Sequence, residues 1–546
     1  MKALIFVFLF ALCTPPAMAQ HGHSDMTAAH EFHPGLGNYH HPITTKNPEA
    51  QKYFDQGLVL LYGFNHAEAA RYFRRASQLD PEAAMPYWGL ALSIGPNYND
   101  TAVDKNRAQA TYDAVREAVS RAPKATARER DYINALAKRY PSPKAESDWK
   151  QFHLDYSNAM RAVAKKYPDD PDATTMFAES LMMLRPWQLW TSDGKPAPPT
   201  LELVAAIESV MKRNPDHPGA NHFYVHAVEA SPNLERAIPS AMRLMTLVPG
   251  AGHLVHMPGH IFLQTGDYEL AAKTNVNAAA ADKAFVRRTG ATGMYPLMYW
   301  THNIHFIAYA RAQQGRYNEA KQAALEMVPN VGDADLEMQM LECFLLYPLM
   351  IDLRFQRWDE ILKTPEPRAD RKLLRAFWQY ARAMALAGQG KLNDAAAEQK
   401  QFESLRASMP AGALYMINNK ASDILALAAA TLDAKLSWAR GEKARSIKEW
   451  RRAVELESTL QYDEPPPWFY PVRESLGAAL LRDGQAKEAE SVFRAAIEKR
   501  PRDGRLLFGL WRSLVAQKRD DEAMFVERQF QAAWKDATMK LRIEDL

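Results

Sequence analysis

Cysteine is nearly absent from this sequence, and its scarcity limits how the fold can be held together. The 546 residues include two cysteines, Cys13 in an apolar N-terminal stretch and Cys343 in "LECFLLY". If the N-terminal stretch is removed, one thiol remains and no internal disulfide can form. Burial of apolar side chains must therefore stabilise the fold, and a metal site built on several thiolates is excluded.

Long uncharged apolar runs are also lacking after the first twenty residues, "MKALIFVFLFALCTPPAMAQ". Lys2 precedes an apolar run that ends at Cys13, and "AMA" (17–19) supplies the small residues that signal peptidase requires. The run is shorter than a stable membrane span. We therefore expect a signal peptide over residues 1–19, no membrane span after its removal, and a periplasmic or secreted protein.

Neither sign of charge dominates. The sequence has 67 Lys and Arg residues against 64 Asp and Glu residues, a formal net charge of +3. No basic stripe is present, which excludes nucleic acid as a partner. Strand patterns are scarce, whereas Ala, Leu, Glu, Arg and Lys recur at helical spacing, so an all-α fold is expected.

A 34-residue repeat organises the chain. Residues 50–83 place small residues at offsets 8, 20 and 27, an aromatic residue at 24 and a proline at 32, and residues 470–503 repeat the pattern. Small residues let two helices approach closely, the aromatic ring fills the space between units, and proline ends the second helix. The residues are Gly57, Ala69, Phe73, Ala76 and Pro81 in the first unit, and Gly477, Ala489, Phe493, Ala496 and Pro501 in the second.

This pattern resembles the tetratricopeptide repeat, a pair of antiparallel helices. The resemblance implies a right-handed α-solenoid with a concave inner surface, which we divide into an N-terminal solenoid (49–341) and a C-terminal solenoid (342–546). Two insertions interrupt the period, 185–199 and 283–300. Insertions into a solenoid often gather on its binding face.

Histidines cluster in the middle of the chain, where five of the 16 lie between residues 222 and 260. His222, His226 and Glu229 follow one another at helical spacings, so they share one helix face. When each repeat is numbered from its own start, the clustered histidines fall at equivalent positions. The resemblance to tetratricopeptide repeats implies that side chains at these positions face the concave groove. The resulting predicted ligands are His222, His226, Glu229, His253, His256, His260, His302 and His305.

Three interpretations of this cluster stay open. Neutral imidazole is a common ligand for zinc, copper, iron and nickel, so the cluster predicts a transition-metal site without choosing among these ions. The histidines would alternatively line a groove that binds a peptide, a protein or a small molecule without metal. A lone buried histidine is often structural, but that reading weakens for seven histidines at equivalent places. His66, outside the cluster, serves as the control.

Four further side chains are candidates for the same groove. "GPNYND" (95–100) carries Asn97 and Asp100 at the end of a predicted helix, although such a sequence also stops helices in ordinary turns. Arg185 lies beside two tryptophans in the first insertion, and Tyr309 occupies the place that histidine takes in the two preceding units. "DEPPPWFYPVRES" (463–475) is a rigid approach with a possible docking or lid role, for which a structural role is the better expectation.

Residues 20–48 form a histidine-rich N-terminal segment. Such tracts often chelate metals loosely, so this one would feed ions to the groove or fold over it, or else be a disordered leader. "HAVEASP", "PGAGHLVHMPGHIF" and "EPPPWFYPVRESLGAALL" together resemble one large group of bacterial tetratricopeptide-repeat proteins without an established activity. The resemblance therefore implies the fold and no reaction: whether the protein is an enzyme, and its oligomeric state, stay open.

Overall fold

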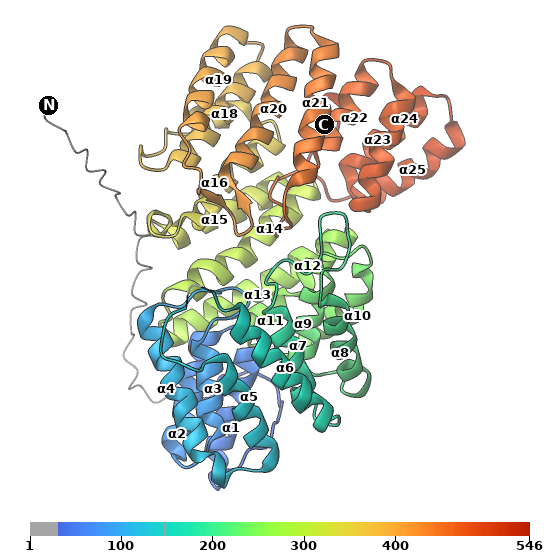
Figure 1. Cartoon of the computed structure of the whole chain (residues 1–546). Coiled ribbons are helices and arrows are strands. Elements are labelled where there is room, and N and C mark those ends of the chain that lie inside the picture. Colours follow the sequence, from blue (N-terminus) through green and yellow to red (C-terminus); the bar gives the residue numbers. More distant parts are fainter. Residues whose placement is uncertain (1–30, 147) are drawn as a thin grey trace, which may run out of the picture.

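The computed structural model describes residues 31–146 and 148–546 (Figure 1). Helices make up nearly all of the regular structure, and within the described residues the only paired strands are β1 (Leu414–Tyr415) and β2 (Asn419–Lys420). The predicted signal peptide and the first part of the predicted histidine-rich segment lie outside the described residues. No helix in the described part of the chain is long and apolar enough to cross a bilayer.

Consecutive helices pack against one another in pairs, as the repeat pattern predicts. The first part of the chain contains α1 (Pro48–Tyr62), α2 (His66–Leu79), α3 (Met85–Ile94), α4 (Lys105–Arg121), η1 (Ala122–Lys124), α5 (Ala127–Arg139), α6 (Lys150–Lys166), α7 (Pro171–Met182), α8 (Thr200–Arg213), α9 (Pro218–Val228), η2 (Leu234–Ala237), α10 (Ile238–Leu247), α11 (Gly252–His256), α12 (Pro258–Thr265), α13 (Tyr268–Thr289), η3 (Tyr295–Trp300), α14 (Thr301–Gln313) and α15 (Tyr317–Val331).

The second part continues in the same way. It contains η4 (Ala334–Leu336), η5 (Gln339–Leu341), α16 (Glu342–Arg354), α17 (Trp358–Lys363), α18 (Lys372–Gly388), α19 (Leu392–Ala407), α20 (Ala421–Ala439), α21 (Lys443–Thr459), α22 (Val472–Arg482), α23 (Ala486–Lys499), α24 (Gly504–Ala516), α25 (Asp520–Ala533) and η6 (Ile543–Asp545).

Several helices begin where a polar cap precedes a proline. The Asn47 side chain accepts hydrogen bonds from two backbone amides of α1, and Asp170 does the same for α7. His217 caps α9 by accepting from the amide of Ala220 through Nδ1, 3.1 Å away. The proline that follows each cap has its backbone preset for the first helical turn and lacks an N–H that would stay unpaired. These caps fix where the histidine-bearing helix α9 starts.

The repeat residues pack as the pattern predicts. Phe73 of α2 lies against the Cα atoms of Gly57 in α1 and Gly89 in α3, where a Cβ would meet its ring. Phe493 occupies the same position near the other end of the chain, between Gly477 and Gly509. Both rings are fully buried, so each one joins three consecutive helices. This confirms the predicted all-α fold of tetratricopeptide-type helix pairs.

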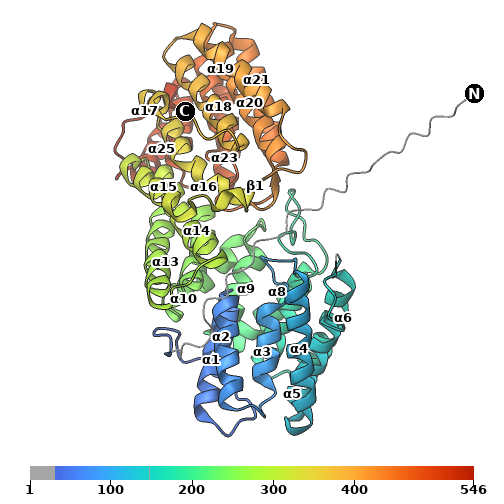
Figure 2. The same ribbon diagram turned by 90° about the vertical axis from the view of Figure 1, so that its left-hand side faces the viewer.

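The helices form two groups that meet at α13 and α14. In Figures 1 and 2 the helices α1–α9 lie largely below α13 and α14, and α16–α25 lie above them, while α10 and α12 lie beside α13 in Figure 1. Contacts cross between the groups: Arg500 Nη1 donates to the Tyr309 hydroxyl at 2.8 Å, and Arg502 pairs with Asp267. The chain therefore brings segments of its C-terminal half next to α12–α14, where the histidines lie.

The described part of the histidine-rich segment packs along the N-terminal helices. His33 exchanges two hydrogen bonds with the Gln56 side chain, and the Gly35 carbonyl accepts from the amide of Gly250 at 2.8 Å. Farther along, Thr44 bonds to Glu129 at the start of α5. Residues 31–47 thus lie across several repeats, passing close to the start of α11 at Gly35 and ending at α1.

Candidate metal centre

The predicted ligands come from α9, α11, α12 and α14, and most of them converge. Three groups of side chains bring one ligand atom each to within 4.8 Å of one another. These groups could hold a metal ion, and they are His222, His226 and His253; His256, His260 and His302; and His226, Glu229 and His260. The side chains are buried in the interior, with only His302 partly exposed, and do not line an open groove.

The first group, which we call the nitrogen triad, consists of His222, His226 and His253. His222 Nδ1 lies 2.5 Å from the Tyr62 carbonyl, which can only accept, so Nδ1 carries the proton. His226 Nδ1 likewise lies 2.9 Å from a carboxylate oxygen of Glu229. The Nε2 atoms of both rings and both nitrogens of His253 are buried without a hydrogen-bond partner. Metal-binding histidines typically have one nitrogen anchored and the other free in this way.

The electrostatics favour neutral rings at His222 and His253. Burial, together with the neighbouring imidazoles, lowers the pKa of both residues well below the ordinary value of 6.5. A neutral ring offers its lone pair to a metal, whereas an imidazolium cannot. Unpaired buried nitrogens are costly because they lose their hydrogen bonds to water. The triad therefore has the donor atoms and the unmet bonding capacity of a metal site.

The second group contains a direct contact between two imidazoles. His256 Nε2 and His260 Nε2 lie 2.6 Å apart, and His256 Nδ1 lies 2.7 Å from Asn275 Oδ1. The Asn275 amide nitrogen donates to the Ala271 carbonyl, which fixes Oδ1 as an acceptor. His256 Nδ1 is therefore protonated and its Nε2 accepts, so the proton shared by the two rings belongs to His260 Nε2. The His302 ring completes the group, 4.8 Å from that of His256 between centroids.

Glu229 links the two groups. Its carboxylate lies 2.9 Å from His226 Nδ1 through one oxygen and 2.6 Å from His260 Nδ1 through the other. Burial would raise the pKa of Glu229, but the interactions with His226 and His260 outweigh it and hold the pKa below its ordinary value. Glu229 therefore supplies a buried negative charge between the imidazoles, which favours a cation nearby.

Glu464 also reaches this centre, although the sequence analysis did not name it. Its carboxylate contacts His260 Nδ1, the same atom that Glu229 approaches. Burial and the charge of Glu229 raise the pKa of Glu464 well above its ordinary value. The sequence signal was an acidic residue just before three prolines in a segment expected to dock. Because Glu464 lies far along the chain from the histidines, no local pattern indicated which site it would join.

His305 and Tyr309 lie farther along α14, away from the three groups. The His305 ring packs against Tyr347, with centroids 4.1 Å apart, and against Phe344. Burial lowers the pKa of His305 to about 3, and both ring nitrogens lack a partner. Tyr309 is fully buried and bonded to Arg500. On α14 it is therefore His302, at the helix start, that meets the histidines of α11 and α12.

The other groove candidates have local roles. The Asn97 side chain accepts from the amides of Asn99 and Asp100, which closes a turn, and Asp100 pairs with Arg107 at 2.6 Å. Arg185 is exposed on the first insertion. It is the neighbours of Asn97 and Arg185 that reach the nitrogen triad. Tyr98 stacks on Trp187, and both rings contact His226. Both stretches therefore cover the nitrogen triad with aromatic rings.

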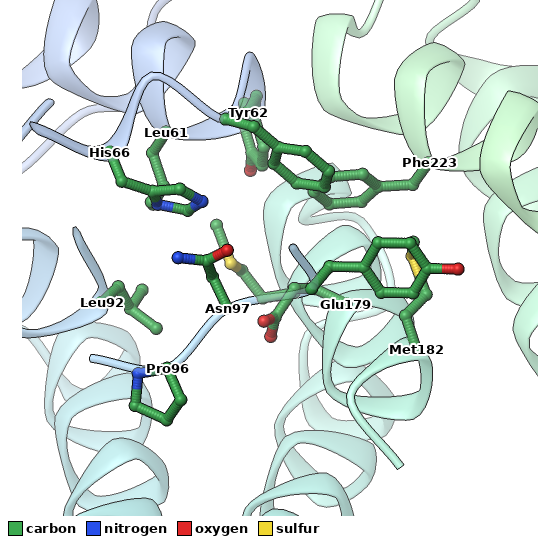
Figure 3. Close-up of a pocket in the computed structure, with 12 residues that line it drawn as sticks. Leu61, Tyr62, His66, Leu92, Pro96, Asn97, Glu179, Met182 and Phe223 are labelled. Atoms are coloured by element: carbon green, nitrogen blue, oxygen red, sulfur yellow. The ribbon is translucent and has the colours of Figure 1, made fainter. Parts of the chain in front are cut away.

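A small cavity adjoins the nitrogen triad. It has a volume of about 20 Å³, enough for a water molecule, and Figure 3 shows His66, Asn97 and Glu179 pointing toward it. Phe64 and Tyr98, which contact the triad histidines, also line this cavity. Two aromatic rings thus separate the cavity from the triad.

A second buried polar cluster lies beneath the N-terminal segment. Asp172 accepts from the hydroxyls of Tyr39 and Tyr62 and lies 2.6 Å from His41 Nδ1. His41, Asp170 and Asp172 form a further group with metal-binding geometry, but the carboxylate of Asp172 is already saturated with protein hydrogen bonds. Tyr62 connects the two centres because its carbonyl anchors His222.

Comparisons with known proteins find only distant similarity. No family model matches the sequence, and no characterised protein aligns with it significantly. Human IFIT1 in a dimer with m7Gppp-AAAA is 13% identical over 90% of this chain and 91% of its own, with a TM-score of 0.31. Yeast Tom70 is 10% identical over 89% and 93%, with a TM-score of 0.29. The P58(IPK) TPR domain is 12% identical over 87% and 99%, with a TM-score of 0.21.

Consecutive helix pairs and the glycine–phenylalanine packing of the repeats give the chain a tetratricopeptide-type fold. The TM-scores to the compared proteins are low, so what those proteins bind does not carry over to this chain.

Proposed function

We propose that this tetratricopeptide-repeat protein binds a first-row transition metal at the nitrogen triad of His222, His226 and His253, and that it does so after export to the periplasm or outside the cell. One observation carries the proposal: the triad presents buried imidazole nitrogens without hydrogen-bond partners, while the opposite nitrogens of two rings are anchored. The predicted signal peptide supports the location.

The chemistry of the donors narrows the ion. Three neutral imidazoles suit zinc, copper, iron and nickel, whereas magnesium and calcium prefer oxygen ligands. In a tetrahedral site the ligand nitrogens lie roughly 3.3 Å apart, so the present spacing within 4.8 Å needs only small ring rotations. Deep burial suits storage or delivery of the ion.

The alternative is a scaffold for protein–protein interaction that holds no metal, which the repeat architecture also accommodates. The unpaired nitrogens favour the metal over this alternative, because a peptide-binding groove would expose its histidines, whereas the triad side chains are at most 4% exposed.

Titration of the metal-free protein with Co²⁺ tests the proposal. We expect visible absorption bands of a nitrogen-coordinated ion that saturate with added Co²⁺ and are displaced by Zn²⁺. The His222→Ala, His253→Ala double variant should weaken this binding by about 100-fold or more, because it removes two of three ligands. His66→Ala, which also removes a buried histidine with unpaired nitrogens, should leave the bands unchanged. Identical titrations of the double variant and the wild type would refute the metal site.

A further inference from the structure

A loop of the C-terminal half reaches into the histidine cluster. Residues 460–471 connect α21 to α22, and Glu464 in this loop contacts His260 of α12. Beside it, the Gln264 amide donates both to the Tyr462 hydroxyl at 2.9 Å and to the Glu229 carbonyl at 2.8 Å. The loop is therefore bound to the same helix turn that carries His260.

The loop is also held firmly on its own side. The Asp463 carboxylate accepts from the Asn419 side chain at 2.8 Å and from the Asn418 backbone amide at 3.2 Å, and both asparagines lie in the β1–β2 hairpin. Farther along, the Phe469 carbonyl accepts from Gln313 of α14. Glu464 is thus presented to His260 by a supported segment, as a ligand on a rigid element would be.

Two carboxyl groups face one nitrogen of His260. His260 Nδ1 lies 2.6 Å from Glu229 and also contacts Glu464. On the other side of the ring, Nε2 lies 2.6 Å from His256 Nε2. The facing oxygen of Glu464 is buried without a hydrogen-bond partner, so three ligand groups converge at one buried point with bonding capacity that a cation would use.

We infer that His260 Nδ1, Glu229 and Glu464 form a second cation position, which we call the carboxylate position, distinct from the nitrogen triad. Its one nitrogen and two carboxylate groups suit the harder divalent ions of the first row, Mn²⁺, Fe²⁺ or Zn²⁺. Glu229 would serve both positions: one oxygen orients His226 of the triad and the other binds the second ion. This inference rests on the proposed function, because it assumes a metal in the triad.

A cation at the carboxylate position would join the two halves of the molecule. Glu229 and His260 belong to the N-terminal helices, whereas Glu464 belongs to the C-terminal loop. Loading this position would therefore stabilise the docked form of residues 460–471. The competing state is an imidazolium at His260 that donates protons from both nitrogens; it needs no cation and predicts no response of the loop to metal.

Counting bound Zn²⁺ in variants of the full-length metal-free protein separates these states. We expect two tightly bound equivalents in the wild type and one in Glu464→Gln, with affinity at the lost position weakened about 100-fold. Glu455→Gln, an exposed residue of α21, is the matched control and should keep both. The histidine-rich segment is unchanged in all variants, so any loose binding there cancels. Two equivalents of unchanged affinity in Glu464→Gln would overturn the inference.

Hydrogen exchange of residues 460–471 supplies an independent readout. Zn²⁺ should slow exchange in the wild type and in Glu455→Gln but not in Glu464→Gln. Equal exchange with and without Zn²⁺ in the wild type would favour the imidazolium state and overturn the inference. If the proposed function itself is wrong, the Co²⁺ bands of the triad will be missing in the wild type, regardless of the result for Glu464→Gln.

Discussion

At the scale of single residues, hydrogen bonds to one ring nitrogen decide what the other can do. Nδ1 of His222 and Nδ1 of His226 each bond to a protein acceptor, which leaves Nε2 of both rings without a partner. His256 differs, because its Nε2 contacts Nε2 of His260, so the protonation of one ring determines that of the other. His66 shows the contrast. Both of its nitrogens are unpaired, but it has no histidine triad around it and faces the small cavity instead.

The buried histidines outside the centre give the metal-free protein a definite pH dependence. Burial lowers the pKa of His66 and of His153 to about 3, against 6.5 for an unperturbed histidine. A lowered pKa means that the unfolded state binds more protons below pH 6.5, so stability is full above pH 6.5 and falls as the pH drops toward 3. At pH 5 each of these two histidines should lower the free energy of unfolding by up to about 2 kcal/mol relative to neutral pH.

Denaturant unfolding of metal-free wild type and His66→Leu at pH 7.5 and pH 5 checks this. The loss of stability between the two pH values should be smaller in His66→Leu by up to about 2 kcal/mol. Equal losses in the two proteins would show that His66 does not stay neutral in the fold.

At the scale of helices, a close approach at Gly252 sets the position of the histidine-bearing helix α11. A Cβ at Gly252 would overlap the carboxylate of Asp282 in α13. That carboxylate is itself held by the Tyr295 hydroxyl at 2.8 Å and by the Asn303 amide at 2.6 Å. Tyr295 belongs to the π-helical turn η3 formed by the second insertion. This insertion therefore helps to hold Asp282, and through it α11, in position.

Gly252→Ala should displace α11 and with it His253 and His256. We expect a loss of stability of about 1–3 kcal/mol from overpacking, and Co²⁺ binding weakened about tenfold, since small displacements of ligands are costly. Gly412→Ala adds the same methyl group where nothing lies within 4 Å, and it should change neither quantity. Co²⁺ titration and denaturant unfolding of the two variants provide the comparison. Normal Co²⁺ binding in Gly252→Ala would mean that this contact does not position the ligands.

Sequence reasoning succeeded where periodicity and local chemistry decide the structure. The spacing of Gly57 and Phe73 predicted their packing, and the spacing of His222 and His226 predicted a shared face. It could not show that His302 meets His256, because that depends on how α14 stacks after an irregular insertion. Glu464 was missed for a similar reason: contacts between distant repeats leave no periodic signal.

At the scale of the whole molecule, the two halves of the solenoid meet around the candidate centre. Arg500 bonds to Tyr309, Arg502 pairs with Asp267, and Glu464 contacts His260. The Glu464 contact covers His260, and the rings of Tyr98 and Trp187 cover the nitrogen triad, so ligands expected in an open groove are buried. A buried centre exchanges its ion slowly if release requires the C-terminal loop to move, so bound metal should survive purification.

The metal content of the protein, purified untagged from the exported fraction without chelator, tests the central claim most directly. We predict at least about one equivalent of a single transition metal by elemental analysis, lost in the His222→Ala, His253→Ala double variant and kept in His66→Ala. Absence of metal in the wild type, together with no gain in thermal stability on adding zinc, copper, iron or nickel salts, would contradict the account. The histidines would then belong to a protein-interaction scaffold.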